Sequence, residues 1–389
     1  MRSALFLAIL LVLIASAVSW RRRRRRRCAP QNCEVGSWTS WSHCNQACGQ
    51  HGTQRRMRIK TKSESCGGKC SFVLVEMRSC NRLSCAGKTL KYRLEYVVKA
   101  WAPLVYLHKD EKFRPSDVDF FLSYVNMVNS RDKKTCKKTT LTSSNLCSGH
   151  KYDFLETKVP LSKPSATNGR VLFGITSSTV KAYAITKTTT NRYYDVYYWL
   201  FYPYNRGKRV CIGLKPKYIG CIGGYSTFGH HVGDWEHVTI RLNWNMEPLQ
   251  FYASAHNFGT RYNYDKQIGV FRKGDREIKM HYSHPVLYSA LGSHGMWDSP
   301  GGHTYKKLFN GERLRDYTSA GHKWYTWANL VVTPYGQWNG QAYFFRFSGR
   351  WGNKKRGCTL SEKFAGECIL NSGPIGPAEK STMSKDPIE

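Results

Sequence analysis

Residues 229–242 read Gly-His-His-Val-Gly-Asp-Trp-Glu-His-Val-Thr-Ile-Arg-Leu. The last five residues alternate between apolar and polar types, which predicts a β-strand with one buried face. The apolar positions of this alternation are Val238, Ile240 and Leu242. The same two-residue period places Asp234 and Glu236 on the inner face, at the mouth of the strand. It places His237 and Arg241 on the outer face. The stretch therefore predicts a core strand that begins with two inward carboxylates.

Two inward carboxylates need cations or hydrogen-bond donors, because burial of an unpaired carboxylate costs several kcal/mol or shifts its pKa. Histidines from three segments are candidate partners, and a mixed set of histidines and carboxylates suits zinc, manganese or magnesium. The predicted metal ligands are His231, Asp234, Glu236, His256 and His294, with His303 nearby. The alternative is a hydrogen-bonded network that holds the loops at one end of the sheet. A divalent metal ion is thus a candidate cofactor, and neither interpretation by itself implies catalysis.

The surrounding region, residues 88–370, has short aromatic and β-branched segments separated by Gly, Asn, Pro and Asp, which is typical of a β-sandwich or barrel. Four such segments are residues 196–202, 238–244, 286–291 and 343–347. One helix is expected after Pro115, because Ser116 and Asp119 resemble a capping box and apolar residues follow at helical spacing. Those apolar residues are Val118, Phe121, Leu122 and Val125. We therefore expect a mainly β fold, with a large β-sandwich-like domain and few short helices.

The chain is long enough for two or three domains. It has 389 residues, of which 41% are hydrophobic and 14% aromatic. This composition supports at least one large core. Residues 371–389 contain Gly, Pro, Ser and charges without apolar periodicity, and we expect a disordered tail there.

The N-terminus is typical of a secretory signal peptide over residues 1–19. Arg2 precedes an apolar run over residues 4–18, and Ala17 and Ser19 suit a cleavage site. The run is shorter than the roughly 20 residues of a membrane-spanning helix, and no later stretch matches its hydrophobicity. Secretion to the extracellular space is therefore expected. The basic flank that follows favours the alternative of a signal anchor, but that topology would leave fourteen cysteines in a reducing compartment.

Seven consecutive arginines, residues 21–27, dominate a polyarginine segment over residues 20–27 and contribute to a formal net charge of +34. Three interpretations of the run stay open: a solvated tail, the recognition site of a basic-cleaving protease, or a contact for acidic partners. Outside the cell such partners are sulfated glycans, acidic extracellular matrix or an anionic membrane surface. Export makes nucleic acid an unlikely partner.

Fourteen cysteines fall into two groups of even number. The first group is Cys28, Cys33, Cys44, Cys48, Cys66, Cys70, Cys80 and Cys85, and the second is Cys136, Cys147, Cys211, Cys221, Cys358 and Cys368. Their spacing lacks the paired ligands of structural zinc sites, so disulfides are expected. Neighbours in the second group suggest three local pairs, Cys136 with Cys147, Cys211 with Cys221, and Cys358 with Cys368. Each bridge would stabilise the fold by roughly 2 to 4 kcal/mol.

The first cysteine-rich region carries a specific pattern. It contains Trp38-x-x-Trp41-x-x-Cys44, then Cys48-Gly49-x-x-Gly52, and finally Cys80 and Cys85. This pattern resembles the thrombospondin type-one repeat, which we place at residues 28–87. The resemblance implies a thin three-strand module with Cys44 bridged to Cys80 and Cys48 to Cys85. The four other cysteines of the region would form two more bridges with undetermined partners.

A module this short has little hydrophobic core, so charged and aromatic side chains must contribute to its stability. Alternate positions of a strand over residues 54–60 would present basic side chains on one face, with the rings of Trp38 and Trp41 stacked between them. The basic side chains of this face are Arg56, Arg58 and Lys60. The repeat family commonly serves adhesion and glycosaminoglycan contact. The predicted glycan contacts are Arg55, Arg56, Arg58, Lys60 and Lys62.

Two modification signals of the repeat family can be compared with this sequence. Trp38 and Trp41 are candidates for C-mannosylation. Ala47 stands where the family usually has a hydroxyl residue, so the O-fucose site of the family is absent.

Four segments of the larger domain resemble the family named after yeast vacuolar protein-sorting protein sixty-two. They are residues 101–105, 110–117, 233–237 and 292–294. That family implies no established chemistry. Residues 231–236 are also similar to the Gly-His-Arg-His-Asp-Trp-Glu motif of necrosis-inducing plant-pathogen toxins, whose β-sandwich holds a metal at a membrane-facing pocket. Val232 and Gly233 stand in place of Arg-His in that motif, so one toxin-like ligand is missing.

The sequence contains no Gly-x-Ser-x-Gly elbow, His-Glu-x-x-His motif or P-loop, so hydrolase and nucleotide chemistry have no motif to support them. It therefore predicts a secreted, non-enzymatic binding, adhesion or matrix protein that contacts acidic glycans or matrix through the repeat and its basic surface. The alternative is a metal-dependent secreted effector that uses the large domain. Such an effector would be a membrane-active defence or toxin protein, or a hydrolase.

Overall fold

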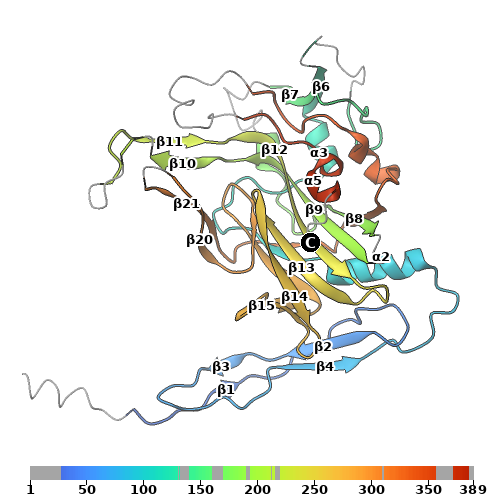
Figure 1. The fold of residues 1–389 in the computed structure, drawn as a ribbon, viewed down its shortest axis with the longest axis vertical. Coiled ribbons are helices and arrows are strands. Elements are labelled where there is room, and N and C mark those ends of the chain that lie inside the picture. The colour runs from blue at the N-terminus through green and yellow to red at the C-terminus, as the bar shows by residue number, and fades with distance from the viewer. Residues whose placement is uncertain are drawn as a thin grey trace, which may run out of the picture. The chain divides into compact units, whose positions relative to one another are not determined.

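The structure, a computed structural model (Figure 1), describes residues 28–129, 131, 140–159, 170–189, 193–211, 213–214, 220–308, 311–355 and 371–384. These form two compact units. The first unit comprises residues 28–40 and 56–76, and the second comprises residues 41–55 and the described residues from 77 onward. The predicted signal peptide and polyarginine segment lie outside the described residues. The predicted boundary after residue 87 falls within the second unit.

The predicted repeat contains four short strands in two pairs. Strand β1 (Glu34–Val35) pairs with β3 (Lys60–Lys62), and β2 (Thr53–Met57) pairs with β4 (Val75–Ser79). Disulfides join Cys28 to Cys66, Cys33 to Cys70, Cys44 to Cys80, and Cys48 to Cys85. The last two are the pairs that the resemblance to the repeat implies. The first two give partners to the four cysteines whose pairing the sequence leaves open.

Guanidinium groups stack on the tryptophan rings of the repeat. In the first unit, Arg56 and Arg58 lie 4.9 and 4.3 Å from the centre of the Trp38 ring. In the second unit, Arg78 of β4 lies 4.2 Å from the centre of the Trp41 ring. The predicted cation–π layers are therefore present, and Arg78 takes part in them although the sequence pattern does not indicate it.

The second unit is built around an eight-stranded sheet (Figure 1). In spatial order its strands are β16 (Arg276–Glu277), β15 (Val270–Lys273), β14 (Phe258–Asp265), β13 (Pro248–Ala255), β12 (His231–Leu242), β9 (Tyr194–Asn205), β8 (Ala182–Thr188) and β23 (Leu330–Pro334). All neighbours are antiparallel except β8 and β23, which run parallel. Residues 196–202 lie within β9, and residues 238–242 end β12, as the sequence predicts.

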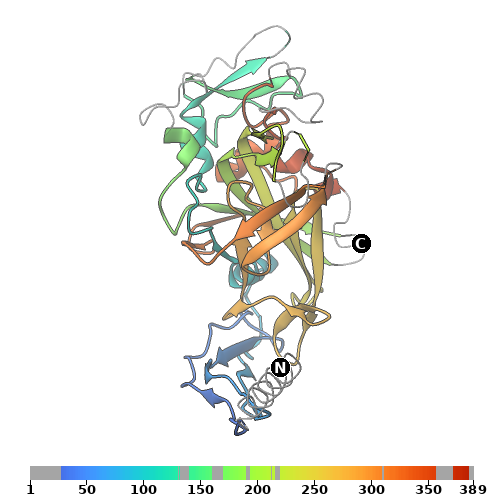
Figure 2. The same cartoon turned by 90° about the vertical axis from the view of Figure 1, so that its left-hand side faces the viewer.

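A second sheet has the order β17 (Met280–His281), β18 (His284–Ser289), β5 (Leu104–Tyr106) and β22 (Lys323–Tyr325), and β19 (Met296–Trp297) pairs with β18. Three two-stranded sheets complete the unit: β6 (Val125–Asn129) with β7 (Asp153–Thr157), β10 (Lys208–Cys211) with β11 (Tyr225–Phe228), and β20 (Gly301–Lys307) with β21 (Arg313–Thr318). Figure 2 shows the β20–β21 hairpin, in orange, crossing the long green and yellow strands. The fold is therefore mainly β, as predicted.

The eight-stranded sheet carries a core on each face. The first core joins its side chains to the second sheet and includes Val238, Ile240, Val105 and Leu287. The second core lies on the opposite face and includes Trp199, Trp235, Phe344 and Trp351. Strand β12 is thus covered on both sides. The prediction that His237 and Arg241 face outward to solvent is wrong, because their exposed fractions are 4% and 5%. A one-faced alternation cannot reveal that a second layer covers the polar face.

Helices cover small parts of the unit. They are α2 (Leu90–Trp101), α3 (Val118–Leu122) and α5 (Ser381–Ser384), with 3₁₀ turns η1 (Arg170–Phe173), η2 (Gly340–Arg346) and η3 (Pro377–Glu379). The longest, α2, is absent from our sequence-based expectation. Its signals are present, since the Thr89 side chain accepts a hydrogen bond from the Tyr92 amide, and Val97, Val98 and Trp101 are buried at helical spacing.

The helix expected after Pro115 exists but differs from the prediction. It is α3, only five residues long, and Val125 belongs to strand β6. The Asp119 carboxylate accepts hydrogen bonds from the amide and hydroxyl of Ser143, so it serves a neighbouring loop and not the capping box. Asp117 is the N-cap residue. Long-range contacts of the acidic side chain thus replaced the local cap.

Two further segments differ from the sequence-based expectation. Residues 343–347, expected as a strand, lie mostly in η2, which turns Phe344 and Phe345 together into the second core. Residues 371–384, expected to be disordered, form η3 and α5. The Met383 side chain is fully buried, and Ile375 bridges to Arg350. A single buried methionine without periodicity gives no sequence signal of order.

Disulfides in the rest of the second unit agree in part with the predicted local pairs. Cys211 is joined to Cys221, which staples the β10–β11 hairpin. Cys147 is disulfide-bonded. Cys136, Cys358 and Cys368 lie outside the described residues. Among the residues that the structure describes, no helix is long and apolar enough to span a membrane.

The buried Asp195–Arg241 pair offers a test of the packing between β9 and β12. The Arg241 Nε and Nη2 atoms lie 2.8 and 2.9 Å from the two carboxylate oxygens of Asp195. We expect Arg241→Ala to lower the free energy of unfolding by about 3 to 5 kcal/mol, because it removes the bidentate guanidinium partner of a buried carboxylate. Urea unfolding would measure this.

The double variant Asp195→Ala/Arg241→Ala should recover part of the loss, because it removes both buried charges. A cost below about 1 kcal/mol for Arg241→Ala would contradict the burial of this pair.

Candidate functional site

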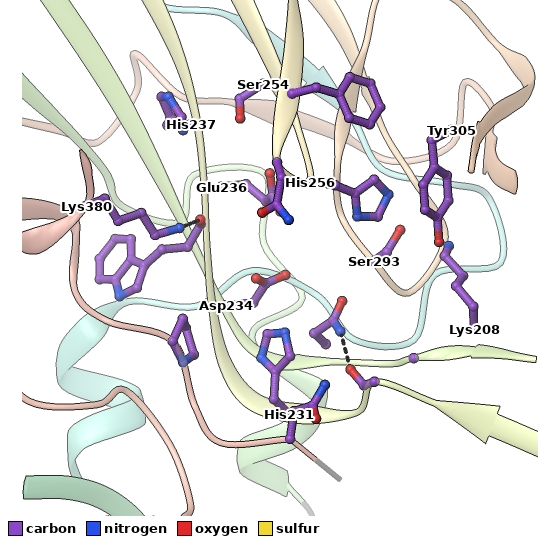
Figure 3. A pocket seen from close by; sticks show the side chains of 18 of the residues that line it. Lys208, His231, Asp234, Glu236, His237, Ser254, His256, Ser293, Tyr305 and Lys380 are labelled. Carbon is purple, nitrogen blue, oxygen red and sulfur yellow. Dashed lines mark hydrogen bonds between the residues drawn. The ribbon is translucent and has the colours of Figure 1, made fainter. Parts of the chain in front are cut away.

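A pocket opens where two central strands of the eight-stranded sheet separate. Strands β12 and β13 pair only from Val238 opposite Ala253 to Leu242 opposite Pro248. The first half of β12 pairs with β9 alone. The edge freed in this way borders a pocket of about 750 Å³ (Figure 3). Its wall includes Asp234, Glu236, His231, His237, Ser254, His256, Asn257, Phe258, Tyr305, Lys208 and Lys380.

Gly233 allows this part of β12 to approach the second core closely. Its φ is +68°, in the left-handed region that favours glycine. A Cβ atom at this position would lie 2.0 Å from the Trp351 carbonyl oxygen. No side chain fits there, so glycine is required for β12 to follow its path just before Asp234.

Asp234 lies on the same face of β12 as the first core, as the sequence predicts, and is 7% exposed. One of its carboxylate oxygens, Oδ2, lies 3.0 Å from Nδ1 of the fully buried His294. Burial alone would raise the pKa of Asp234, but the hydrogen bond from His294 and the positive charges of His231 and Lys380 outweigh it and hold the pKa below its ordinary value. Asp234 therefore stays ionised in the pocket wall.

His294 is held from every side. Its ring stacks on Tyr202 with 3.8 Å between ring centres. Its Nε2 atom lies 3.0 Å from the Phe113 carbonyl oxygen and 3.8 Å from a Glu111 carboxylate oxygen. Each ring nitrogen thus faces an oxygen atom, which fixes the orientation of the ring. His294 supports Asp234 from behind the pocket and does not line the pocket itself.

Glu236, two residues further along the same face, has the opposite electrostatic environment. No histidine donates to its carboxyl group among the described residues. Burial and the negative charge of Asp234 raise the pKa of Glu236 well above its ordinary value, and the positive charge of Lys380 offsets this only in part. Its side chain is partly accessible from the pocket. The pocket therefore presents an ionised carboxylate beside a carboxyl group that favours its protonated form.

A second buried carboxylate organises the opposite wall. Asp316 is fully buried and accepts four hydrogen bonds. The donors are Lys208 Nζ at 2.8 Å, Ser293 Oγ at 2.8 Å, His256 Nε2 at 2.9 Å and Trp297 Nε1 at 2.9 Å. Burial alone would raise its pKa, but these donors and charges lower it well below the ordinary value. Asp316 thus orients His256 and Lys208 in the wall of the pocket.

Two histidines of residues 229–242 differ in their surroundings. The Nδ1 atom of His231 lies 2.7 Å from the Gly233 carbonyl oxygen, which accepts a hydrogen bond from it. His237 stacks on Trp199 with 4.5 Å between ring centres, and its Nε2 atom has no hydrogen-bond partner among the described residues. Burial, with the nearby charge of Lys380, lowers the pKa of His237 to about 3. His237 is therefore a neutral ring in the pocket wall.

The structure brings four of the five predicted metal ligands to one pocket. His231, Asp234, Glu236 and His256 line the pocket, but His256 is bound to Asp316, and His294 lies behind Asp234. Among the described residues, only Cys33, Glu64 and Cys70 bring three potential ligand atoms within 4.8 Å of one another. Both of these cysteines form a disulfide. The arrangement fits the hydrogen-bonded network that the sequence left as the alternative.

The predicted glycan contacts in the repeat all have intramolecular partners. Arg56 pairs with Glu76, Lys60 with Glu64, and Lys62 with Glu34, while Arg58 donates to the Val73 carbonyl oxygen. In the second unit, Arg55 is only 5% exposed and donates to the Gly269 carbonyl oxygen. Arg55 is thus buried, the Arg56–Glu76 pair is half-buried, and the ion pairs of Lys60 and Lys62 are exposed. Trp38 and Trp41, the C-mannosylation candidates, carry stacked arginines.

Sequence reasoning missed the residues that connect this site. Lys380 lies in the segment expected to be disordered. Asp316 lies in β21, and Glu111 in a loop. Each of these residues is distant in sequence from the predicted site residues, and only the folding of the chain brings it to the site. The one available signal was Glu111, which lies within the stretch that resembles the sorting family.

Much of the chain is similar in sequence to known proteins. The model of the family described as "Vacuolar protein sorting-associated protein 62" matches residues 80–316. The putative vacuolar protein sorting-associated protein TDA6 of Saccharomyces cerevisiae is 26% identical over 72% of this chain and 65% of its own length. Vacuolar protein sorting-associated protein 62 of the same yeast is 25% identical over 76% of this chain and 68% of its own length. The chain thus spans about two thirds of the length of these curated relatives.

Solved structures give a fainter likeness. A crystal structure of Necrosis and Ethylene inducing Protein 2, from the causal agent of cocoa's Witches Broom disease, has 13% identity and a TM-score of 0.25, and the match covers 60% of this chain and 72% of that one. NLPPya in complex with glucosamine has 15% identity and a TM-score of 0.26 over 62% and 73%.

The raised pKa of Glu236 predicts a pH-dependent stability. The folded protein holds the Glu236 proton more tightly than the unfolded chain, so the free energy of unfolding falls as the pH rises from about 4 through the raised pKa. Glutamine does not titrate and removes this loss. We expect Glu236→Gln to melt a few degrees higher than wild type at pH 7 and at the same temperature near pH 4, as calorimetry would measure.

The matched control is Glu277→Gln, at an exposed position of β16, which should leave the melting temperature unchanged. Equal destabilisation by Glu236→Gln at both pH values would show that the pKa of Glu236 is not raised in the folded protein.

Proposed function

The chain belongs to the vacuolar protein sorting-associated protein 62 family, and on that premise we propose that it is an extracellular binding protein with two recognition surfaces. The pocket between β12 and β13 would bind a hydroxylated ligand, namely a sugar ring of a glycan. The basic side chains of the predicted repeat would contact acidic glycans. The extracellular location is supported by five disulfides among the described residues, since cytosolic proteins rarely keep disulfides.

The feature that carries the proposal for the pocket is a pair of carboxyl groups on one strand face whose pKa values are shifted in opposite directions. A sugar hydroxyl both donates and accepts hydrogen bonds. Ionised Asp234 accepts, while Glu236 in its protonated form donates. The Asn257 amide, in the same wall, can do both. The pocket thus offers both partners that each hydroxyl requires.

Size and aromatic content also suit a sugar ring. The volume of about 750 Å³ lies within the range of ligand pockets. The rings of Phe258 and Tyr305 line the wall and offer apolar faces against which the C–H groups of a sugar can pack. A metal-dependent effector has less support, because three of the predicted ligands, Asp234, His256 and His294, are engaged in separate hydrogen bonds.

Binding to a glycan microarray tests the pocket. We expect wild type to bind a restricted set of glycans. Asp234→Asn should weaken binding about tenfold or more, because a hydrogen bond to a charged group is lost, and Asn257→Ala about threefold to tenfold. Glu236→Gln keeps a donor at the same place and should keep binding.

The control is Asn126→Ala, an exposed change in β6 away from the pocket, which should bind as wild type does. Absence of glycan binding by wild type, or an equal loss in the control, would refute the pocket proposal.

Heparin affinity tests the repeat separately. The ion pairs of Lys60 and Lys62 are exposed and each contributes no more than about 1 kcal/mol, so sulfate groups can replace Glu64 and Glu34 as partners. In a chain lacking residues 21–27, Lys60→Ala/Lys62→Ala should elute at lower salt than its parent. Lys306→Ala/Lys307→Ala, on exposed β20 positions, should change elution less. An equal shift of the elution salt concentration for both pairs would show that heparin binding reflects non-specific charge alone.

A further inference from the structure

Lys380 is an amine that the proposed binding function does not use. It lies in the pocket wall with its amine at the freed edge of β12 (Figure 3). Its segment is anchored on both sides, because Pro377 and the fully buried Met383 pack into the second unit. The Trp351 amide donates to the Pro374 carbonyl oxygen at 2.8 Å, and Lys187 donates to the Met383 carbonyl oxygen. The amine is therefore held in place by packing, not carried on a loose tail.

The contacts of the amine are unusual for a lysine. Its Nζ atom donates to the Trp235 carbonyl oxygen at 2.7 Å and lies 5.3 Å from the centre of the Trp199 ring. No carboxylate oxygen lies within 4.0 Å of it among the described residues. Lys208, in the same pocket, has Asp316 at 2.8 Å. Lys380 thus lacks the close carboxylate that keeps most buried lysines charged.

The charged and titratable groups around Lys380 come from β12. Burial lowers the pKa of Lys380, and the charges of Glu236 and Asp234 counteract this only in part, so the pKa lies below its ordinary value. The third neighbour, His237, is neutral. The neutral form of the amine, which is the nucleophile, is therefore more accessible in this pocket than on an exposed lysine.

We propose that Lys380 is a nucleophilic lysine that forms an imine with the carbonyl group of a small hydroxylated aldehyde or ketone in the pocket between β12 and β13. The nitrogen lone pair forms a bond to the carbonyl carbon, and the carbonyl electrons move to oxygen, which takes a proton from the nitrogen. The resulting carbinolamine then loses its hydroxyl group as water when a proton is supplied and the C=N bond forms.

We assign the supply of that proton to Glu236. Its carboxyl group lines the same pocket and favours its protonated form, because it is buried beside the charge of Asp234. The balance is one amine, one carbonyl and one carboxylic acid giving one protonated imine, one water and one carboxylate. The product pairs the new cation with the Glu236 carboxylate. No oxidant, metal or further reactant is required.

The hydroxylated class of carbonyl follows from the rest of the wall. Asp234 accepts hydrogen bonds, and Ser254 and Asn257 lie in the same pocket. Hydroxyl groups beside the carbonyl can be bound by these side chains, whereas an apolar aldehyde would leave them without partners. This inference concerns the same pocket as the proposed glycan site, but it does not require that a glycan bind there.

Reductive trapping tests the amine. The full chain is incubated at pH 7 with limiting glycolaldehyde and sodium cyanoborohydride, which reduces the protonated imine to a stable secondary amine. Peptide mapping by mass spectrometry then gives the labelling rate of each lysine. We expect Lys380 to be labelled on the order of tenfold faster than Lys208, its matched control in the same pocket. It should also exceed Lys91, an exposed lysine on α2.

A second variant separates nucleophilicity from proton supply. Glu236→Gln should slow trapping at Lys380 but should not slow its reaction with trinitrobenzenesulfonate, because that reaction expels no water and loss of the Glu236 charge can only lower the pKa of Lys380 further. Labelling of Lys380 no faster than Lys208 and Lys91 in the wild-type chain would overturn the proposal. This readout is independent of the microarray, so a chain that binds no glycan can still confirm the reactive lysine, and a chain that binds glycans can still refute it.

Discussion

The partial pairing of β12 is the constraint on which the site depends. On one side the strand is bonded to β9 along its length, while on the other it leaves β13 before Val238. A strand edge inside a sheet normally has all its backbone groups paired. Here the gap is bordered by side chains from β13, β14, the β10 and β20 hairpins and the C-terminal segment. Lys380 gives the Trp235 carbonyl oxygen the hydrogen bond that β13 does not supply. The pocket is thus a consequence of sheet geometry, and not of a loop.

Two carboxyl groups on one strand face acquire different properties because their neighbours differ. Asp234 has a buried histidine behind it, and that histidine is held by Tyr202 and by the Phe113 carbonyl oxygen. Glu236 has no such donor among the described residues, and the charge of Lys380, which is itself partly desolvated, offsets the burial of Glu236 only in part. The protonated form of one group and the ionised form of the other follow from this asymmetry. The raised pKa of Glu236 lowers the free energy of unfolding at neutral pH. Residues that destabilise a fold in this way are commonly found at functional sites.

The predicted repeat is stabilised in a different way from the large sheet. It has few apolar side chains to bury, and its stability comes from four disulfides and from arginines stacked on tryptophans. Its basic surface is therefore engaged in intramolecular contacts of two kinds. Stacked Arg56 and Arg58 contribute to the module, and the exposed ion pairs of Lys60 and Lys62 can exchange partners at little cost. This division separates the basic side chains that stabilise the module from those that the proposed function assigns to acidic glycans.

The sequence by itself determined the local features. The alternation over residues 238–242 fixed which side chains of β12 face the first core, and the two-residue period carried Asp234 and Glu236 to the same face, because strand geometry is local. The cysteine pattern, through its resemblance to a known repeat, indicated two disulfides that the structure contains. Only the tertiary structure decided the rest. A second layer buried His237 and Arg241. His294 reached Asp234 across 60 residues, and Lys380 reached Trp235 across 145. Periodicity describes neighbours along a strand, whereas such contacts depend on how distant segments pack, and no local pattern records that.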